Sequence, residues 1–302
     1  MDGLLIIDKP DGLTSHDVVA RVRRILKTKR VGHTGTLDPF ATGVMVILIG
    51  QATRLAQFLD KDEKEYEAVV RFGFETDTGD RTGTRSAECG IRDEEIADLL
   101  AKTSWDQILS PFRGKIEQVP PMYSAKKVEG KKLYELARKG VEIERKPVNI
   151  TIHTLEVLND GEIRTPHSTL RIRVICSAGT YIRTLAEDIG RSVGVGAHLA
   201  ELRRTRAGRF DISRAVTLSD LEETTDPASA LIPMSEAVAH LPEVILIEDR
   251  VTKTRNGLST RFPDVVFDDG EIVRMVNSDV DLIAIGVYNA NEKTVQPKVV
   301  LG

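Results

Sequence analysis

The chain has 302 residues, of which 41% are hydrophobic and 29% charged, the composition of an ordinary globular protein. Its longest clean apolar run, residues 44–49, is too short to span a membrane, and its opening MDGLLIIDKP lacks the basic region of a secretory signal. The cysteines Cys89 and Cys176 lie far apart without metal-binding spacing, so we expect a cytoplasmic protein with no disulfide framework and no metal site.

The net charge of −4 hides an uneven distribution along the chain. Residues 215–302 contain 7 basic and 15 acidic side chains, a net −8, which leaves +4 for residues 1–214. Within that first part, residues 111–150 hold 10 basic and 5 acidic side chains, and basic clusters also occur at 21–30 and 203–209. Any one cluster is typical of a solvated helix face, whereas the three together are also compatible with a surface that faces RNA or DNA.

The first part of the chain predicts short strands and helices in alternation. Residues 4–7 form an apolar strand, and TSHD at 14–17 has the pattern of a helix-capping box before apolar residues at helical spacing. The stretch GHTGTLDPFATG at 32–43 reads as a loop and is followed by a buried strand at 44–50 and a helix near 52–60. Residues 66–74 then predict a strand, 75–83 a polar turn and 92–107 a helix.

Beyond Pro111, a strand near 112–119 leads into a basic segment in which residues 130–139 predict a helix that stops at Gly140. Strands are expected at 147–158 and 169–177, a helix at 180–192, a strand at 198–204 and a helical stretch at 233–242. Because the strands and helices follow no regular βαβ repeat, the order predicts an α+β sheet domain.

The tail differs in character from the main body. Residues 243–302 read as short apolar strands separated by NG, DDG and NAN turns, which predicts a small appended β-barrel. Its acidic balance contrasts with the basic part before it and favours a boundary near Pro242. We therefore expect a main domain over 1–242, with the basic insertion at 111–150, and a second domain over 243–302.

The loop GHTGTLDPFATG surrounds one carboxylate, Asp38, with glycines, threonines, a proline and a histidine. Its small residues would let the backbone of another molecule come close. Taken alone, Asp38 before a proline is more typical of a turn than of a reactive group. Other stretches of the chain decide between the two interpretations.

Several stretches occur together in a specific order: KPDGLTSHDVV, GHTGTLDPFATG, KEYEA, FGFETDTGD, VPPMYSAKKVEGKKLYELARKG, GTYIRTLAEDIG, GAHLAELRR and a final PKVVL. In this order and spacing they resemble the TruB family of tRNA pseudouridine synthases over nearly the whole chain. The resemblance implies a catalytic domain of pseudouridine synthase type, with a mixed, largely antiparallel sheet, and a small C-terminal PUA-like β-barrel. Thr36 is the one departure within the loop, at a position where the family tolerates small residues.

The resemblance also implies roles for individual residues. The family's catalytic aspartate falls on Asp38, the arginine paired with it on Arg183, and the tyrosine stacked on the target base on Tyr66. The remaining matches are substrate-binding or loop-supporting positions: His33, Tyr181, Leu202, Lys9 and Pro10. Each of these residue types alone would more often be structural, and their joint order supports the functional interpretation.

The implied reaction converts a T-loop uridine, position 55 of tRNA, to pseudouridine. Because the N1–C1′ bond breaks and the uracil rejoins through C5 with no atoms gained, the reaction requires no cofactor, metal or redox partner. The expected partner is tRNA, bound at its T-arm and through the C-terminal domain at its acceptor end, with no membrane and no obligatory protein partner. Two alternatives stay open: a guide-RNA-dependent synthase subunit, or an RNA-folding or RNA-binding protein that does not need catalysis.

Overall fold

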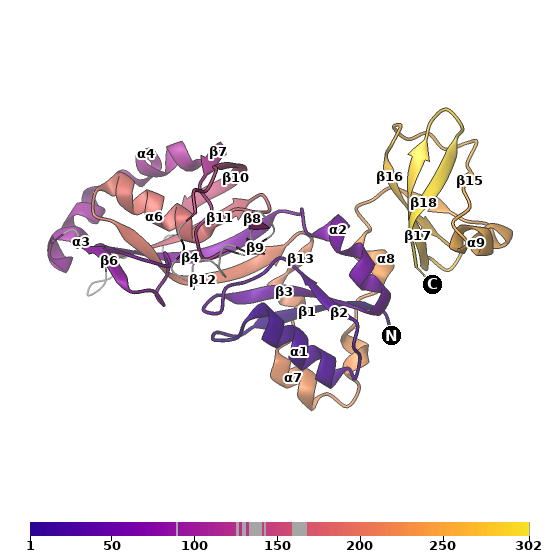
Figure 1. The fold of residues 1–302 in the computed structure, drawn as a ribbon, viewed down its shortest axis with the longest axis horizontal. Helices are drawn as coiled ribbons and strands as arrows, with labels where there is room; N and C mark the ends of the chain where they lie inside the picture. The colour runs from indigo at the N-terminus through magenta and orange to yellow at the C-terminus, as the bar shows by residue number, and fades with distance from the viewer. Residues whose placement is uncertain are drawn as a thin grey trace.

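A computed structural model describes residues 1–88, 90–124, 127–128, 131–132, 141, 143–158 and 168–301 of the chain. Figure 1 shows an elongated molecule. A large curved sheet with its helices makes up one end, and a small C-terminal sheet makes up the other. The helix predicted over 130–139 and its stop at Gly140 lie outside the described residues, as does part of the basic segment 111–150. Within the described ranges no helix has the length and apolarity needed to cross a membrane.

The large sheet forms the body of the molecule. Its strand order is β1-β3-β12-β4-β11-β10-β7, with β2 paired to β3 and β13 to β12. All neighbouring pairs are antiparallel except β3 with β12. The strands are β1 (Gly3–Lys9), β2 (Val31–Thr34), β3 (Thr42–Ile49), β4 (Lys64–Phe72), β7 (Gly114–Gln118), β10 (Val148–Val157), β11 (Thr169–Cys176), β12 (Ala197–Ala207) and β13 (Phe210–Asp211).

Helices cover the sheet and connect its strands. The predicted capping box is present, because the Thr14 side chain accepts from the Asp17 amide while the Asp17 carboxylate accepts from the Thr14 amide. The helices of the main body are α1 (Ser15–Ile25), α2 (Ala56–Leu59), α3 (Asp93–Lys102), α4 (Trp105–Leu109), α6 (Ile182–Val193), α7 (Leu218–Glu223) and α8 (Met234–Ala237).

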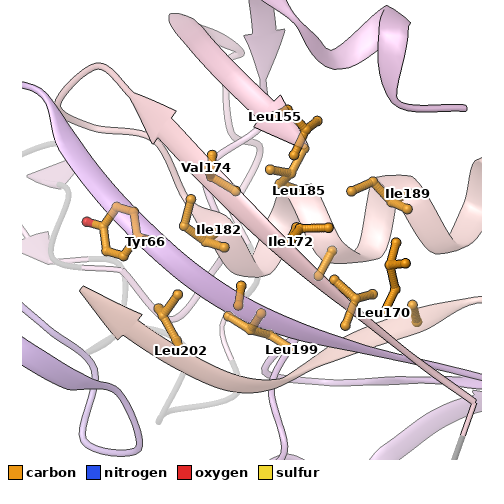
Figure 2. Close-up of a cluster of buried hydrophobic side chains, with 14 of the residues drawn as sticks. Tyr66, Leu155, Leu170, Ile172, Val174, Ile182, Leu185, Ile189, Leu199 and Leu202 are labelled. Carbon is orange, nitrogen blue, oxygen red and sulfur yellow. The ribbon is translucent and has the colours of Figure 1, made fainter. Parts of the chain in front are cut away.

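Helix α6 packs across the middle of the sheet and closes its main core. Figure 2 shows Leu185 and Ile189 of this helix facing side chains from β11 and β12, among them Ile172 and Leu199. The helix ends at Val193 and is followed by Gly194, which takes a left-handed conformation with φ of 86° that favours glycine. Because the first turn of α6 emerges at the edge of this core, its side chains reach the loop between β2 and β3.

The C-terminal part is a separate five-stranded sheet with one helix, in the order β14-β16-β17-β18-β15. Its own core includes Val273, Met275 and Val295, while Leu282 and Val299 belong to an apolar cluster shared with β1 and β3. The elements are β14 (Glu243–Ile245), α9 (Glu248–Arg255), β15 (Thr260–Arg261), β16 (Ile272–Val276), β17 (Leu282–Asn289) and β18 (Thr294–Val300). Two small ribbons complete the described chain: β5 (Phe74–Thr76) with β6 (Arg85–Glu88), and β8 (Lys127–Val128) with β9 (Lys131–Lys132).

The predicted α+β class with a mostly antiparallel sheet is confirmed, while local predictions differ in several places. The helix predicted near 52–60 is α-helical only over α2, and the helical stretch predicted at 233–242 is helical only over α8. His33 lies in β2 rather than in a loop, because its backbone pairs with Ile47 of β3 although the sequence around it shows no alternation. Tyr66 is the third residue of β4, not its first. Residues 92–107 contain two helices instead of one, and the tail predicted as strands alone includes α9, whose charged sequence EDRVTKTR carries too weak an apolar pattern to reveal a helix.

Candidate active site

Asp38 lies in the loop between β2 and β3 and forms a two-pronged ion pair with Arg183. Its Oδ2 is 2.9 Å from Nε of the arginine, and Nη2 donates to its Oδ1 at 3.2 Å. The carboxylate side chain is 32% exposed, whereas the guanidinium side chain is only 6% exposed. The buried cation therefore holds a carboxylate that another molecule can reach.

Arg183, in the first turn of α6, uses its remaining donors to bind two further segments of the chain. Nη1 donates to the carbonyl of Thr78 at 2.9 Å, and Nη2 to the carbonyl of Tyr123 at 2.8 Å. Nη1 also lies 3.6 Å from Oδ2 of Asp80. The planar fork of an arginine suits this arrangement, because it offers several donors in fixed directions. One side chain thus joins the Asp38 loop, the turn before β6 and the segment after β7.

Asp80 is the member of this cluster that the sequence reasoning missed. It is buried, and its Oδ1 accepts from the backbone amide of Thr82 at 2.9 Å and from the hydroxyl of Thr78 at 3.0 Å. The signal was present in FGFETDTGD, but a threonine-rich turn around an aspartate reads as ordinary turn chemistry. Arg183 therefore lies between two carboxylates, of which only Asp38 is open to solvent.

The surroundings of Asp38 act on its ionisation in opposite directions. Burial raises the pKa of Asp38 above its ordinary value of 3.8, and the nearby Asp80 adds to that rise. Arg183 is the main opposing influence and lowers the same pKa, with a smaller contribution from Lys9. The outcome is a carboxylate that titrates above an ordinary aspartate and whose charge depends on the guanidinium beside it.

Lys9 and Ser15 hold the middle of the Asp38 loop. Lys9, fully buried at the end of β1, donates from Nζ to the carbonyl of Pro39 and to that of Pro10, both at 2.9 Å. Ser15 Oγ donates to the carbonyl of Leu37 at 3.0 Å and accepts from its amide at 2.9 Å. Burial lowers the pKa of Lys9 to about 8, because the charged form is disfavoured away from water. Residues on either side of Asp38 are thus fixed by side chains from the start of the chain.

Tyr66 and Leu202 lie on the apolar side of the site. Both are buried, and Figure 2 shows Tyr66 at one end of the core cluster beside Leu202 and Ile182, with its hydroxyl directed away from the apolar side chains. Burial raises the pKa of Tyr66, while the charge of Arg204 and a hydrogen bond to it act in the opposite direction. Tyr66 is therefore a protonated phenol at neutral pH.

His33 lies in β2, ahead of the Asp38 loop, and Tyr181 lies directly before α6, which carries Arg183. His33 is half-buried, and its ring lies 6.0 Å edge-on from the ring of His16 in α1. Burial lowers the pKa of His33, so the ring is neutral at neutral pH, and its Nδ1 has no hydrogen-bond partner among the described residues. Tyr181 precedes α6, with its backbone amide and carbonyl both bound by the Gln118 side chain at 2.8 and 3.0 Å. Gln118 thereby fixes the start of the helix that carries Arg183.

The structure brings Asp38, Arg183 and Lys9 into one cluster, with Tyr66 and Leu202 on a neighbouring apolar wall. Pro10 takes part only through its carbonyl, which accepts from Lys9. Within the described ranges, no three His, Cys, Asp or Glu side chains are grouped so that they could hold a metal ion. The chemistry that the described residues offer is that of a reachable carboxylate, a buried guanidinium and a phenol.

Known proteins resemble this chain over most of its length. The family model described as TruB family pseudouridylate synthase (N terminal domain) matches residues 23–182, and the one described as tRNA pseudouridylate synthase B C-terminal domain matches residues 183–239. A tRNA pseudouridine synthase B of Solibacter usitatus (strain Ellin6076) is 43% identical over 95% of both chains. One of Aromatoleum aromaticum (strain DSM 19018 / LMG 30748 / EbN1) is 48% identical over 82% of this chain and 77% of the other. A chain in a crystal structure of a Cbf5-Nop10-Gar1 complex is 28% identical, covers 99% of this chain and 84% of its own length, and matches with a TM-score of 0.72. The chain belongs to the TruB family of pseudouridylate synthases.

Proposed function

We propose that this protein isomerises a uridine of tRNA to pseudouridine, at position 55 in the T-loop. The observation that carries the proposal is the reachable carboxylate of Asp38 in a two-pronged pair with the buried Arg183. Relatives that are 43% and 48% identical to this chain over the aligned residues are named tRNA pseudouridine synthase B, which supports tRNA as the substrate.

The reaction breaks the N1–C1′ bond, turns the uracil within the site and joins C5 to C1′, so that the product has the same atoms as the substrate. Asp38 is the group that meets the ribose or the ring, since an ionised carboxylate acts as a nucleophile or stabilises positive charge at C1′. Attack at C1′, addition to the pyrimidine and a glycal route all begin from this ionised form. Arg183 maintains the form against the effect of burial. The C5 proton finally leaves to Asp38, directly or through water, because the raised pKa of Tyr66 keeps its phenol protonated at neutral pH.

The uridine has to leave its stack before Asp38 can reach the sugar. Extruding a base costs a few kcal/mol, and an aromatic face that receives the base offsets part of that cost. We assign the stacking role to Tyr66 and the walls of the uridine pocket to Tyr181 and Leu202. His33 fills the space that the base leaves, because a neutral ring stacks without a charge penalty.

The rest of the tRNA is assigned to the basic insertion at 111–150 and to the C-terminal domain over 243–302. The net +5 of the insertion suits contacts with phosphates, which position a nucleic acid without reading its sequence. The acidic C-terminal domain has fewer cations to offer and would contact the acceptor end over a small area. A tRNA substrate also places the proposed reaction in the cytoplasm.

The stand-alone enzyme is favoured over a guide-RNA-dependent subunit. The match to a tRNA pseudouridylate synthase B C-terminal domain over residues 183–239 supports it, and so does the higher identity to tRNA pseudouridine synthases B than to the chain of the Cbf5-Nop10-Gar1 complex. The purified protein, incubated with an unmodified tRNA transcript and with no guide RNA or cofactor, should form pseudouridine at position 55. A transcript with cytidine at that position serves as the control. Product that appears only when a guide RNA is added would replace the proposal with its alternative, and binding without product would support the RNA-folding interpretation.

A further inference from the structure

Arg204, in β12, is a fully buried cation that lies beside the candidate active site. It is 1% exposed, and none of the ion pairs among the described residues includes it. Its neighbour Arg203, on the other face of the same strand, is 40% exposed and forms a two-pronged ion pair with Asp8 at 2.7 and 3.1 Å. A buried charge without a counter-ion is costly unless its donors are satisfied, so the partners of Arg204 explain why it is there.

Those partners are backbone carbonyls at the start of the Asp38 loop and in the first residues of β3 after it. Nε donates to the carbonyl of Val44 at 2.6 Å, and Nη2 donates to the carbonyl of Gly35 at 3.1 Å. The backbone of Arg204 also pairs with Gly43, where a β-carbon would come within 2.2 Å of the Arg204 carbonyl oxygen. Only glycine at position 43 lets the two backbones come this close, so β12 lies in direct contact with the start of β3.

The same guanidinium reaches Tyr66. Arg204 and Tyr66 are cross-strand partners in β12 and β4, and the nearby guanidinium lowers the pKa of the Tyr66 phenol against the effect of burial. A guanidinium has only donors, so a hydrogen bond between the two groups would be accepted by the phenol oxygen. One side chain thus contacts the loop of the carboxylate and the ring assigned to base stacking.

We infer that Arg204 is a positioning residue for the isomerisation, which fixes the Asp38 loop relative to the hydroxyl of Tyr66. The inference rests on the proposed function and adds to it a residue that contacts neither the sugar nor the base. Lysine cannot replace this role, because its single ammonium is a point charge and not a planar fork.

The test compares Arg204→Lys and Arg204→Gln with the matched pair Arg203→Lys and Arg203→Gln. Both Arg204 variants should lower the single-turnover rate constant by about 10- to 100-fold, since a loop displaced by 1 Å costs that much. Their affinity for tRNA should stay within about threefold, because phosphate contacts dominate binding. The Arg203 variants should lose thermal stability and keep the rate constant. Should one Arg204 variant be insoluble, the other carries the same comparison.

Two further readouts do not depend on turnover. In Arg204→Gln the absorbance titration of Tyr66, assigned by its loss in Tyr66→Phe, should move to higher pH, and amide hydrogen exchange of residues 35–44 should speed up. The Arg203 variants should change neither. A wild-type rate constant in Arg204→Lys, or losses that follow stability alike at both arginines, would overturn the inference. If the wild-type protein forms no pseudouridine, the proposed function fails, and the titration and exchange data still decide whether Arg204 links the loop to Tyr66.

Discussion

The surroundings of Asp38 and the C-terminal sheet bury different kinds of side chain. Among the described residues, every buried lysine, arginine and aspartate lies within the first 207 positions: Lys9, Lys64, Asp80, Arg183 and Arg204. The C-terminal sheet has an apolar core, and its buried polar side chains are the threonines at 254 and 260. Taking a charge out of water costs several kcal/mol per ion, and only well-placed partners repay that cost.

This difference separates two ways of using the interior. Around Asp38, hydrogen bonds to carbonyls and carboxylates hold ionised groups in place at a cost in stability. Such a cost is typical of residues that take part in function. In the C-terminal sheet, apolar burial supplies stability and leaves any function to the surface. Substitutions in the first region should therefore change the reaction rate more than stability, and substitutions in the second should do the reverse.

The largest effect is expected for Asp38→Asn, which keeps the shape of the side chain and removes its charge. Pseudouridine formation should be abolished, while tRNA affinity stays within about tenfold because phosphate contacts dominate binding. Release of tritium from C5-labelled uridine measures the first quantity, and filter binding the second. Turnover at the normal rate would remove Asp38 from the proposed role.

Arg183→Lys should have the next largest effect on the reaction rate. A lysine keeps one positive charge near Asp38 but cannot also donate to the carbonyls of Thr78 and Tyr123. We expect a loss of about 100-fold or more in the single-turnover rate constant, because positioning and charge are both lost. Arg173→Lys, an exposed arginine bound to Glu65, is the matched control and should keep the wild-type rate. Equal rates in the two variants would mean that the fork is not needed.

Met275→Ala tests the other region. Met275 is fully buried in the core of the C-terminal sheet, and truncation of such a side chain lowers the free energy of unfolding by about 2–5 kcal/mol. At a temperature where the variant is folded, its single-turnover rate constant should match that of the wild type. Val266→Ala, at an exposed position in the same region, should leave stability within about 0.5 kcal/mol. A rate loss in folded Met275→Ala would contradict the separation between the two regions.

The smallest effect concerns pH. Because burial raises the pKa of Asp38 above 3.8 and the ionised form is the active one, the rate constant should fall as the pH decreases through that raised value. The decline should therefore begin at higher pH than for an exposed aspartate. A rate–pH profile measures it, with circular dichroism at each pH to show that the protein stays folded. A midpoint at or below 3.8 would show that Arg183 outweighs burial.

Local signals in the sequence were enough to predict part of this structure. The Thr14–Asp17 box fixed the start of α1, and the apolar run at 44–49 identified β3, because both depend on neighbouring residues alone. The residues of the site came from the order of several motifs, and the structure brings Asp38 and Arg183 together although 145 positions separate them. A pattern among neighbouring residues cannot predict a contact between residues so far apart in the sequence.

The contacts that support the site were beyond the sequence for a related reason. Asp80 and Gln118 act through partners far along the chain, and each looks ordinary among its neighbours. The sequence did contain one indication for Arg204. It lies two residues after Leu202 in a strand, so the two side chains share a face, and a buried Leu202 implies a buried Arg204. The sequence could not say which groups would satisfy the buried guanidinium, since these come from the Asp38 loop and β3.

The apolar cluster that Leu282 and Val299 share with β1 and β3 has a mechanical consequence. If a flexible linker joined the two sheets, they would move independently, and each would bind a partner molecule on its own. Because the two sheets share this apolar interior, their relative position is set when the chain folds. An RNA that contacted both sheets would therefore have to fit one fixed spacing between them.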